Sequence, residues 1–372
     1  MKALILSIKA GMGHHKTGMA IKKYFESQGS ECVMLDTYEY IAPLLSEAVN
    51  GGYLLSTKLT PRAFGKGYEF ALKMNKPEIG MFEKMFDKIS LPKIRKYILE
   101  YSPDVIVSTH PFSAMILNNL ISDKTLENCL TVGVITDFTI HPFWEKTNLD
   151  YYVTASELLD YQMKKKQIPQ NKILPFGIPI EPKFSTKVDK TEARKQVGIK
   201  DMATVLVIMG SMGYGKIFSR LIELDKLQLD FQIVLVCGNN KRLYKTSNAH
   251  HWQHTVYVNG YVDNVDVLMD AADIIVTKPG GLTTSELLAK NLPAVIMSPI
   301  PGQEDRNAEF LLNNGLAVKV TKLTPIDEVV YQLLTNPWRL EALSQSAKRA
   351  AHPDAAKQLC DFIIQKYKDK RQ

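Results

Sequence analysis

Two turns in the second half of the chain contain the residue types that bind anions. The apolar run ADIIVT leads into Pro-Gly-Gly at 279–281, and the run PAVIMS leads into Pro-Gly-Gln-Glu at 301–304; a helical pattern follows each turn. Backbone N–H groups and the helix dipole attract anions to a helix N-terminus, and glycine lets the backbone approach a ligand closely. Because both turns follow adjacent strands, they predict a pocket for a phosphorylated ligand.

Polar side chains beside these turns have the chemistry to hold a sugar. Small residues leave the backbone open to phosphates, whereas carboxylate and amide groups bind hydroxyls. Two structural alternatives would give a similar pattern: a first-turn glutamate that the helix dipole favours, and a turn that only caps a helix. Two successive side chains with sugar-binding chemistry at one helix start nevertheless favour a nucleotide-sugar site. The candidates are Gly280, Gly281 and Thr283 for the phosphates, and Glu286, Gln303, Glu304 and Asn307 for the hydroxyls.

A third glycine turn, GMGH at 11–14, follows the first apolar run, ALILSI. A Rossmann fingerprint would need glycine at 16 and a P-loop would need glycine at 10 and 15, but Lys16, Ala10 and His15 stand there. What remains is a turn that presents His14, and an unperturbed histidine pKa of about 6.5 suits a general base for a hydroxyl. The alternatives are the adjacent His15, or a histidine that only hydrogen-bonds the backbone.

Two further segments follow predicted strands. In GSMGYG at 210–215, Gly210 and Gly213 are placed to bind a diphosphate through backbone N–H groups, unless the segment is only a flexible turn. In TDFTIHPFW at 136–144, Asp137 could orient the base or an acceptor hydroxyl. Trp144 could stack on a sugar or lie at a lipid interface, and packing in the core explains it equally well.

The sequence does not predict a metal site. His250, His251 and His254 lie close together, but no glutamate completes an H-E-x-x-H motif, and a polar loop is the better interpretation. The D-x-D motif by which many sugar transferases hold a divalent cation is also missing. We therefore expect no metal or other cofactor, and backbone dipoles and hydrogen-bond donors to stabilise the leaving group.

The charge of +7 is concentrated in one segment. Residues 53–97 contain ten Lys or Arg and four acids among many large apolar residues, a mixture suited to an anionic membrane surface, with Arg62, Lys66 and Lys73 as candidate contacts. The alternative is a helical pair with a solvated basic face; a nucleic-acid-binding motif does not accompany the charge. No apolar run reaches the roughly 20 residues that cross a bilayer, and the four scattered cysteines fit a reducing cytosol.

The elements that position these residues form two α/β runs. Short apolar strands alternate with helices in each half, which is typical of parallel sheets covered on both faces. Three prolines and a polar stretch interrupt the pattern at about 175–191, which indicates a linker. The second run begins at ATVLVIMG, and the tail from about 337 to 370 is predicted to be helical.

The order of these motifs resembles that of a known family. The blocks resemble the processive diacylglycerol glycosyltransferases of Gram-positive bacteria and the plant monogalactosyldiacylglycerol synthases, and they occur in family order over nearly the whole chain. They are GMGH at 11–14, TDF at 136–138, HPFW at 141–144, GIPI at 177–180, KPGGLTTSE at 278–286 and PIPGQEDRNAEFLLNNG at 299–315.

The resemblance implies an α/β fold of the GT-B type, two Rossmann-like domains with an interdomain cleft. Residues 1–178 would form the acceptor and membrane domain, and residues 179–345 the donor domain. Residues 346–372 would form a helix that packs back on the first domain. In this family His14 would be the base, Glu286 would bind the ribose, and Gln303 and Glu304 would contact the hexose; Gly13 is counted with the donor-binding residues.

The activity implied is inverting transfer of a hexose from UDP-hexose, with UDP-glucose favoured and UDP-galactose second. The acceptor would be diacylglycerol or a glycosyldiacylglycerol, and the protein would be peripheral on the cytoplasmic face of the membrane. Within the same fold, a peptidoglycan-precursor GlcNAc transferase and a UDP-GlcNAc 2-epimerase are alternatives. A UDP-sugar sensor without turnover is a rival of another class.

Overall fold

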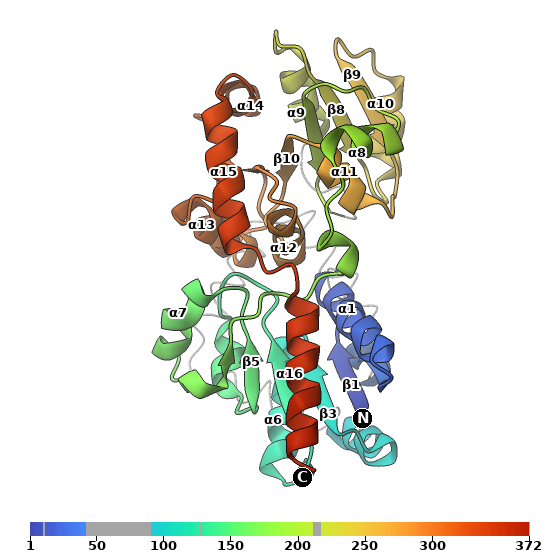
Figure 1. The fold of residues 1–372 in the computed structure, drawn as a ribbon, viewed down its shortest axis with the longest axis vertical. Helices are drawn as coiled ribbons and strands as arrows, with labels where there is room; N and C mark the ends of the chain where they lie inside the picture. The colour runs from blue at the N-terminus through green and yellow to red at the C-terminus, as the bar shows by residue number, and fades with distance from the viewer. Residues whose placement is uncertain (10–11, 42–90, 127, 211–216, 372) are drawn as a thin grey trace. The chain divides into compact units, whose positions relative to one another are not determined.

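The computed structural model describes residues 1–9, 12–41, 91–126, 128–210 and 217–371 (Figure 1). They form two compact units: unit 1 is Met1–Pro182 together with Asp354–Gln372, and unit 2 is Lys183–Pro353. The chain passes between the units after Pro182 and after Pro353, whereas the family resemblance implies boundaries at positions 178 and 345.

Unit 1 is built on a parallel sheet with the strand order β2-β1-β3-β4-β5-β6. Strands β1, β3 and β4 are apolar and almost fully buried, which is typical of parallel strands covered on both faces. The chain leaves β1 toward β2 and returns on the other side as β3, so the strand order reverses between β1 and β3. The strands are β1 (Lys2–Ser7), β2 (Glu31–Asp36), β3 (Val105–Ser108), β4 (Leu130–Val134), β5 (Tyr151–Val153) and β6 (Ile173–Leu174).

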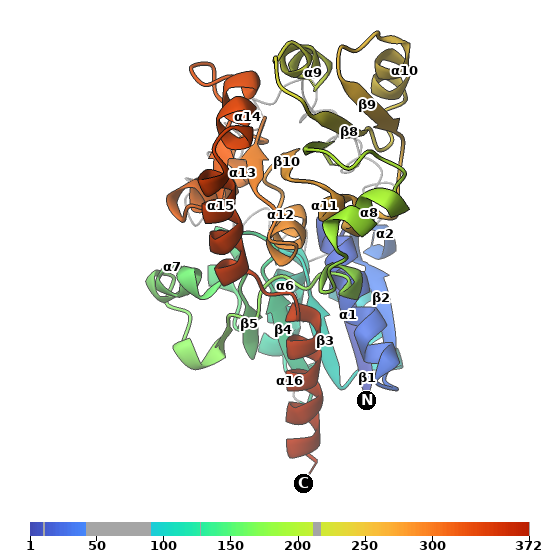
Figure 2. The ribbon, with the colours of Figure 1, turned by 45° about the horizontal axis from the view of Figure 1, so that its top comes forward.

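The helices of unit 1 include one from the far end of the chain. Helix α16 lies beside α1 in both views (Figures 1 and 2). Its Leu359, Cys360 and Ile363 are buried in the same core cluster as Ile21 and Phe25 of α1. Within its described residues the helices are α1 (Gly13–Ser27), α2 (Thr37–Ile41), α6 (Pro111–Ser122), α7 (Asp160–Lys165) and α16 (Ala355–Asp369), with the 3-10 turns η1 (Pro142–Lys146), η2 (Glu157–Leu159) and η3 (Gln170–Lys172).

Unit 2 is built on a second parallel sheet, in the order β12-β11-β10-β7-β8-β9. This is the doubly wound Rossmann order, and it reverses between β7 and β10. The strands are β7 (Thr204–Ile208), β8 (Gln232–Val236), β9 (Thr255–Asn259), β10 (Ile274–Thr277), β11 (Ala294–Ile296) and β12 (Ala317–Lys319).

Eight helices of unit 2 connect and cover these strands within the described residues. They are α8 (Lys190–Gln196), α9 (Ile217–Asp225), α10 (Lys241–Ala249), α11 (Val265–Ala271), α12 (Gly281–Ala289), α13 (Gln303–Asn313), α14 (Ile326–Leu334) and α15 (Pro337–Ala350); a 3-10 turn, η4 (Pro182–Phe184), lies where the chain enters the unit. Helix α8 begins inside the polar stretch that the sequence indicates as a linker, because Asp189 caps it by accepting the N–H groups of Thr191 and Glu192.

In the part of the chain that the structure describes, none of the helices combines the length and the apolar character needed to cross a membrane.

Candidate functional site

The first group of candidate residues lies at the carboxyl edge of the sheet in unit 1. His14 follows β1 at the start of α1, Thr109 and His110 follow β3, and Thr136 and Asp137 follow β4. Because β1 and β3 flank the point where the strand order reverses, this is where doubly wound sheets bind their ligands. Folding therefore brings together residues that are more than 90 positions apart in the chain.

The hydrogen bonds of His14 define its tautomer. Nδ1 lies 2.8 Å from the carbonyl oxygen of Thr109 and 2.7 Å from the hydroxyl of Thr136. A carbonyl oxygen only accepts, so Nδ1 must carry the proton and donate it. The lone pair of the neutral ring is then on Nε2. This is the tautomer that a general base needs.

The surroundings of His14 also set its charge. Burial lowers its pKa from the ordinary value of 6.5, while the negative charge of Asp137 and the bond to Thr109 act in the opposite direction. Burial is the largest of these effects, so the imidazole is neutral at pH 7. Asp137 is thus close enough to favour the imidazolium that forms when the base takes up a proton.

Two further histidines surround this site, and both are part of a repeated His-Pro-Phe sequence. His110 caps α6 and His141 caps η1, and in each case Nδ1 accepts the N–H of the phenylalanine two residues on, at 3.2 Å. The rings of His14 and His110 contact edge to face, with 4.6 Å between centroids. Burial, together with His14 and His141, holds the pKa of His110 well below 6.5.

Sequence reasoning did not identify His110, Thr109 or Thr136. A signal was present: His-Pro-Phe occurs twice, at 110–112 and 141–143, after two strands that pair in the sheet.

Trp144 requires a correction. Its side chain is 2% exposed, packs directly over Gly133 and lies edge to face with Tyr152. A Cβ atom at position 133 would lie only 2.6 Å from the indole ring. Trp144 is therefore a core residue in this structure, which was one of the two interpretations of the sequence, and its prediction as an acceptor or membrane contact was wrong because the space left by Gly133 on the preceding strand β4 accommodates the ring.

The second group of candidates lies at the carboxyl edge of the sheet in unit 2. Gly210 follows β7, Gly280 and Gly281 follow β10, and Gln303 and Glu304 begin the helix after β11. Helix α12 begins at Gly281, and its N-cap residue Gly280 provides no side-chain cap. The N–H groups of its first turn therefore face the turn, as in helix N-termini that bind phosphate. Thr283 and Glu286 lie on the same helix.

Three contacts hold the turns after β10 and β11 in place. Asn307, which has no exposed surface, donates from Nδ2 to the carbonyl of Pro279 at 3.0 Å. Glu304 accepts the N–H of Ile300 at 2.8 Å through one oxygen and pairs with Lys278 through the other. The structure thus gives Asn307 a supporting role at this turn. Lys278 is a charged residue at the centre of the donor candidates that sequence reasoning passed over, although it begins the KPGG block.

The predicted site residues thus fall into two groups. His14, Asp137 and Gly13 belong to unit 1, while Gly210, Gly280, Gly281, Thr283, Glu286, Gln303, Glu304 and Asn307 belong to unit 2. Gly213, Arg62, Lys66 and Lys73 lie outside the described residues.

The histidines near position 250 have structural contacts. His254 lies between two oxygen acceptors: Nδ1 is 3.1 Å from the carbonyl of Asp225, and Nε2 is 2.9 Å from the carbonyl of Leu229. His250 packs edge to face on Trp252. Among the described residues, no group of three or more His, Cys, Asp or Glu side chains is arranged to hold a metal ion.

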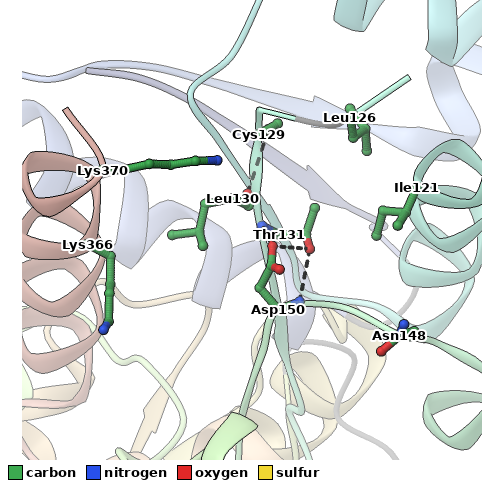
Figure 3. Close-up of a pocket in the computed structure, with 9 residues that line it drawn as sticks. All are labelled: Ile121, Leu126, Cys129, Leu130, Thr131, Asn148, Asp150, Lys366 and Lys370. Carbon is green, nitrogen blue, oxygen red and sulfur yellow. Dashed lines mark hydrogen bonds between the residues drawn. The ribbon is translucent and has the colours of Figure 1, made fainter. Parts of the chain in front are cut away.

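A cavity of about 490 Å³ lies at the opposite, amino edge of the sheet in unit 1 (Figure 3). Leu130 and Thr131 at the start of β4 line it, as do Lys366 and Lys370 of α16. Asp150, also in its wall, accepts from the backbone and the hydroxyl of Thr131, each at 2.8 Å. None of the predicted site residues lines this cavity.

Comparisons with solved structures assign the fold. The crystal structure of MurG from Acinetobacter baumannii aligns with a TM-score of 0.62 at 16% identity, covering 98% of this chain and 99% of that one. The glycosyltransferase of kitacinnamycin aligns with a TM-score of 0.66 at 13% identity, covering 98% of each chain. Two doubly wound parallel sheets with these neighbours define the GT-B class, as the sequence predicts.

Comparisons of sequence define the family. A model of monogalactosyldiacylglycerol (MGDG) synthase matches residues 14–180, and a model of the glycosyltransferase family 28 C-terminal domain matches residues 204–359. The processive diacylglycerol beta-glucosyltransferase of Bacillus pumilus is 30% identical over 98% of this chain and 94% of the relative. That of Bacillus subtilis is 28% identical over 93% of this chain and 90% of the relative.

This chain therefore belongs to the family of processive diacylglycerol glycosyltransferases and monogalactosyldiacylglycerol synthases, within glycosyltransferase family 28, and it is a glycosyltransferase. The resemblance inferred from the ordered motifs is confirmed.

Proposed function

We propose that this protein is an inverting, metal-independent glycosyltransferase that transfers a hexose from UDP-hexose to diacylglycerol or a glycosyldiacylglycerol. UDP-glucose is the favoured donor and UDP-galactose the second choice, because the relatives at 28–30% identity are named beta-glucosyltransferases. The protein would act at the cytoplasmic face of the membrane as a peripheral enzyme.

The observation that carries the proposal is the tautomer of His14. With Nδ1 donating to the carbonyl of Thr109, the lone pair on Nε2 is available to take a proton from the acceptor hydroxyl. The acceptor oxygen then attacks C1 of the hexose from the face opposite the diphosphate. The bond from C1 to the β-phosphate oxygen breaks, and UDP leaves with the electron pair. The proton remains on His14, and Asp137 stabilises the resulting positive charge.

Residues of unit 2 would hold the donor. The turn at Gly280 and Gly281 presents backbone N–H groups to the diphosphate. Glu286 would accept hydrogen bonds from the ribose hydroxyls, and Gln303 and Glu304 from the hexose. Helix N-termini and backbone donors provide the charge stabilisation that a metal supplies in other sugar transferases.

The test is a transfer assay with purified protein, diacylglycerol vesicles and one of three donors: UDP-glucose, UDP-galactose or UDP-GlcNAc. We expect a glycosyldiacylglycerol from UDP-glucose, detected by lipid chromatography. His14→Ala should lower kcat by about 10²- to 10⁴-fold, the usual contribution of a general base, while UDP affinity stays within about twofold.

Other outcomes favour the alternatives. Conversion of UDP-GlcNAc without added lipid would indicate an epimerase, and its transfer to a peptidoglycan lipid precursor would indicate the GlcNAc transferase. UDP-sugar binding without any product would indicate a sensor. Near-normal turnover by the His14→Ala variant would show that another group is the base.

A further inference from the structure

The donor candidates of unit 2 surround one positive charge, the ammonium group of Lys278. Lys278 follows β10 and immediately precedes the Pro-Gly-Gly turn. Strands β10 and β7 are neighbours at the point where the strand order of the sheet reverses. In doubly wound sheets this crevice is the ligand-binding position, so Lys278 lies where an incoming donor is expected.

The side chain of Lys278 extends across the turn that follows β7. A Cβ atom at Gly210 would lie 2.9 Å from Cε of Lys278, closer than such atoms approach in proteins. Gly210 also has a φ of +72°, in the left-handed region that favours glycine. Glycine at this position therefore serves both the backbone conformation and the path of the lysine side chain.

The ammonium group of Lys278 ends at Glu304, the first-turn carboxylate of α13. The two side chains form an ion pair and are 22% and 11% exposed. A Cβ atom at Gly280 would lie 3.9 Å from the same Glu304 oxygen, so the pair sits directly beside the predicted phosphate turn. One lysine thus connects the three turns that follow β7, β10 and β11.

We propose that Lys278 is the cation of the donor site, and that its ammonium group exchanges the ion pair with Glu304 for the diphosphate of the nucleotide sugar. The inference rests on the proposed function, which identifies the ligand of these turns as a nucleoside diphosphate sugar. A diphosphate carries more negative charge than one carboxylate and attracts the ammonium group more strongly. The exchange frees a Glu304 oxygen to accept a hydroxyl hydrogen of the hexose.

This exchange couples binding of the diphosphate to binding of the hexose. The hexose-binding carboxylate becomes available only when a diphosphate occupies the turn, so UDP-hexose is preferred over a free sugar. In the transfer step, the C1–oxygen bond breaks and the β-phosphate gains one negative charge. Lys278 then stabilises the leaving group, beside the backbone donors of α12.

The test measures UDP affinity by calorimetry in variants that give opposite results if the proposal is correct. Lys278→Gln should weaken UDP binding about 10- to 100-fold, the usual effect of losing one charge-assisted hydrogen bond. Glu304→Gln should bind UDP as tightly as the wild type or more tightly, because the ammonium group no longer has a competing partner, while it loses affinity for UDP-glucose. Lys245→Gln, which removes an exposed lysine of α10, is the matched control and should change neither affinity.

A purely structural ion pair predicts a different pattern. Equal weakening of UDP binding by Lys278→Gln and Glu304→Gln would overturn the proposal, as would a Lys278→Gln variant that binds UDP within twofold of the wild type. If the single variant does not fold, Lys278→Gln/Glu304→Gln keeps two neutral amides in contact and is compared with Glu304→Gln alone. The double variant should bind UDP at least tenfold more weakly; equal affinity of the two contradicts the proposal.

The two proposals fail in distinguishable ways. A wild-type protein that binds UDP but transfers no hexose to lipid contradicts the proposed function and leaves the role of Lys278 intact. A wild-type protein that transfers hexose, together with a Lys278→Gln variant of unchanged UDP affinity, contradicts only the role of Lys278. A wild-type protein without affinity for UDP contradicts both.

Discussion

Two neighbours of different kinds favour the proposed role of His14 as the base. The carbonyl of Thr109 fixes the proton on Nδ1, and Asp137 provides a negative charge that stabilises the protonated ring. Burial lowers the pKa of His14, whereas the negative charge of Asp137 raises it. Their combination leaves the imidazole neutral but able to accept a proton.

A pH profile tests this combination. Because the pKa of His14 is lowered from 6.5, the ring releases its proton at a lower pH than a free histidine and stays competent as a base further into the acid range. We expect kcat/KM for the lipid acceptor, measured from pH 5 to 8, to fall only below pH 6.5. The adjacent His15 provides the control: His15→Asn should leave this acid limb in place. A limb above pH 6.5, or one that disappears in the His15 variant, would contradict the assignment.

At this scale the sequence predicted candidates that stand in recognisable motifs, but it passed over His110 and Lys278, whose motifs were present, and it missed residues whose place depends on the fold. His14 follows a recognisable glycine turn, and Glu286 and Gln303 follow the two strand–turn–helix motifs. Thr109 and Thr136 carry no such signal, because their roles arise only when β1, β3 and β4 become neighbours in the sheet. Trp144 was assigned wrongly for the same reason, since its burial depends on Gly133 of another segment.

At the scale of elements, the strands were the most predictable part. The runs ATVLVIMG and ADIIVT correspond to β7 (Thr204–Ile208) and β10 (Ile274–Thr277), because a parallel strand that is buried on both faces is apolar along its length. The short strands β6 and β12 were missed, because Pro175 directly follows β6 and Lys319 is part of β12, so neither lies in an uninterrupted apolar run like the one that contains β11. Helix α1 begins at Gly13, within the GMGH turn, because Met12 takes a left-handed conformation, with a φ of 52°, that lets the helix start at once.

Helix α16 gives a prediction for this scale, because it contributes to the core of unit 1 from the far end of the chain. Leu359 is fully buried in the cluster with Ile21 and Phe25. Leu359→Ala should lower the free energy of unfolding by about 2–5 kcal/mol, the usual effect of a cavity in a packed core. Denaturant unfolding measures the change, and Lys368→Ala, an exposed position of the same helix, should have an effect below about 0.5 kcal/mol.

The effect of Leu359→Ala on UDP binding gives a second test, because the substitution lies in unit 1 and the donor candidates lie in unit 2. Since Leu359 belongs to unit 1, UDP binding by unit 2 should persist in the folded Leu359→Ala variant. A free energy of unfolding equal to that of the wild type would show that α16 is not part of the folding core of unit 1.

For the whole molecule, one architectural rule accounts for both groups of candidates. Each unit contains a doubly wound parallel sheet, and the candidates of each lie at the carboxyl edge beside the reversal of strand order. In unit 1, His14 follows β1 and His110 follows β3. In unit 2, Gly210 follows β7 and Lys278 follows β10. The sequence predicted the architecture from the alternation of strands and helices, but the strand order emerged only from the structure.

The distribution of charge leads to a prediction for the whole molecule. The net charge is +7, and residues 53–97 account for much of it with ten basic and four acidic residues. Most of this segment, including Arg62, Lys66 and Lys73, lies outside the described residues, so its role as a membrane contact remains a prediction from sequence. Basic residues near an anionic surface contribute about 1 kcal/mol each to binding.

Replacement of these three residues by glutamine should therefore weaken binding to vesicles with anionic lipid by about 3 kcal/mol, or roughly 100-fold in the partition constant. The control replaces three exposed lysines of unit 2, Lys226, Lys241 and Lys245, and removes the same total charge. If the position of the charges matters, vesicle sedimentation will show the loss of binding only in the first variant.

Salt gives a second readout. Raising the ionic strength from about 0.1 to 1 M shortens the screening length from about 10 to 3 Å, and it should reduce wild-type binding to the level of the first variant. Equal losses in the two triple variants would show that net charge, rather than this segment, attracts the protein to the membrane.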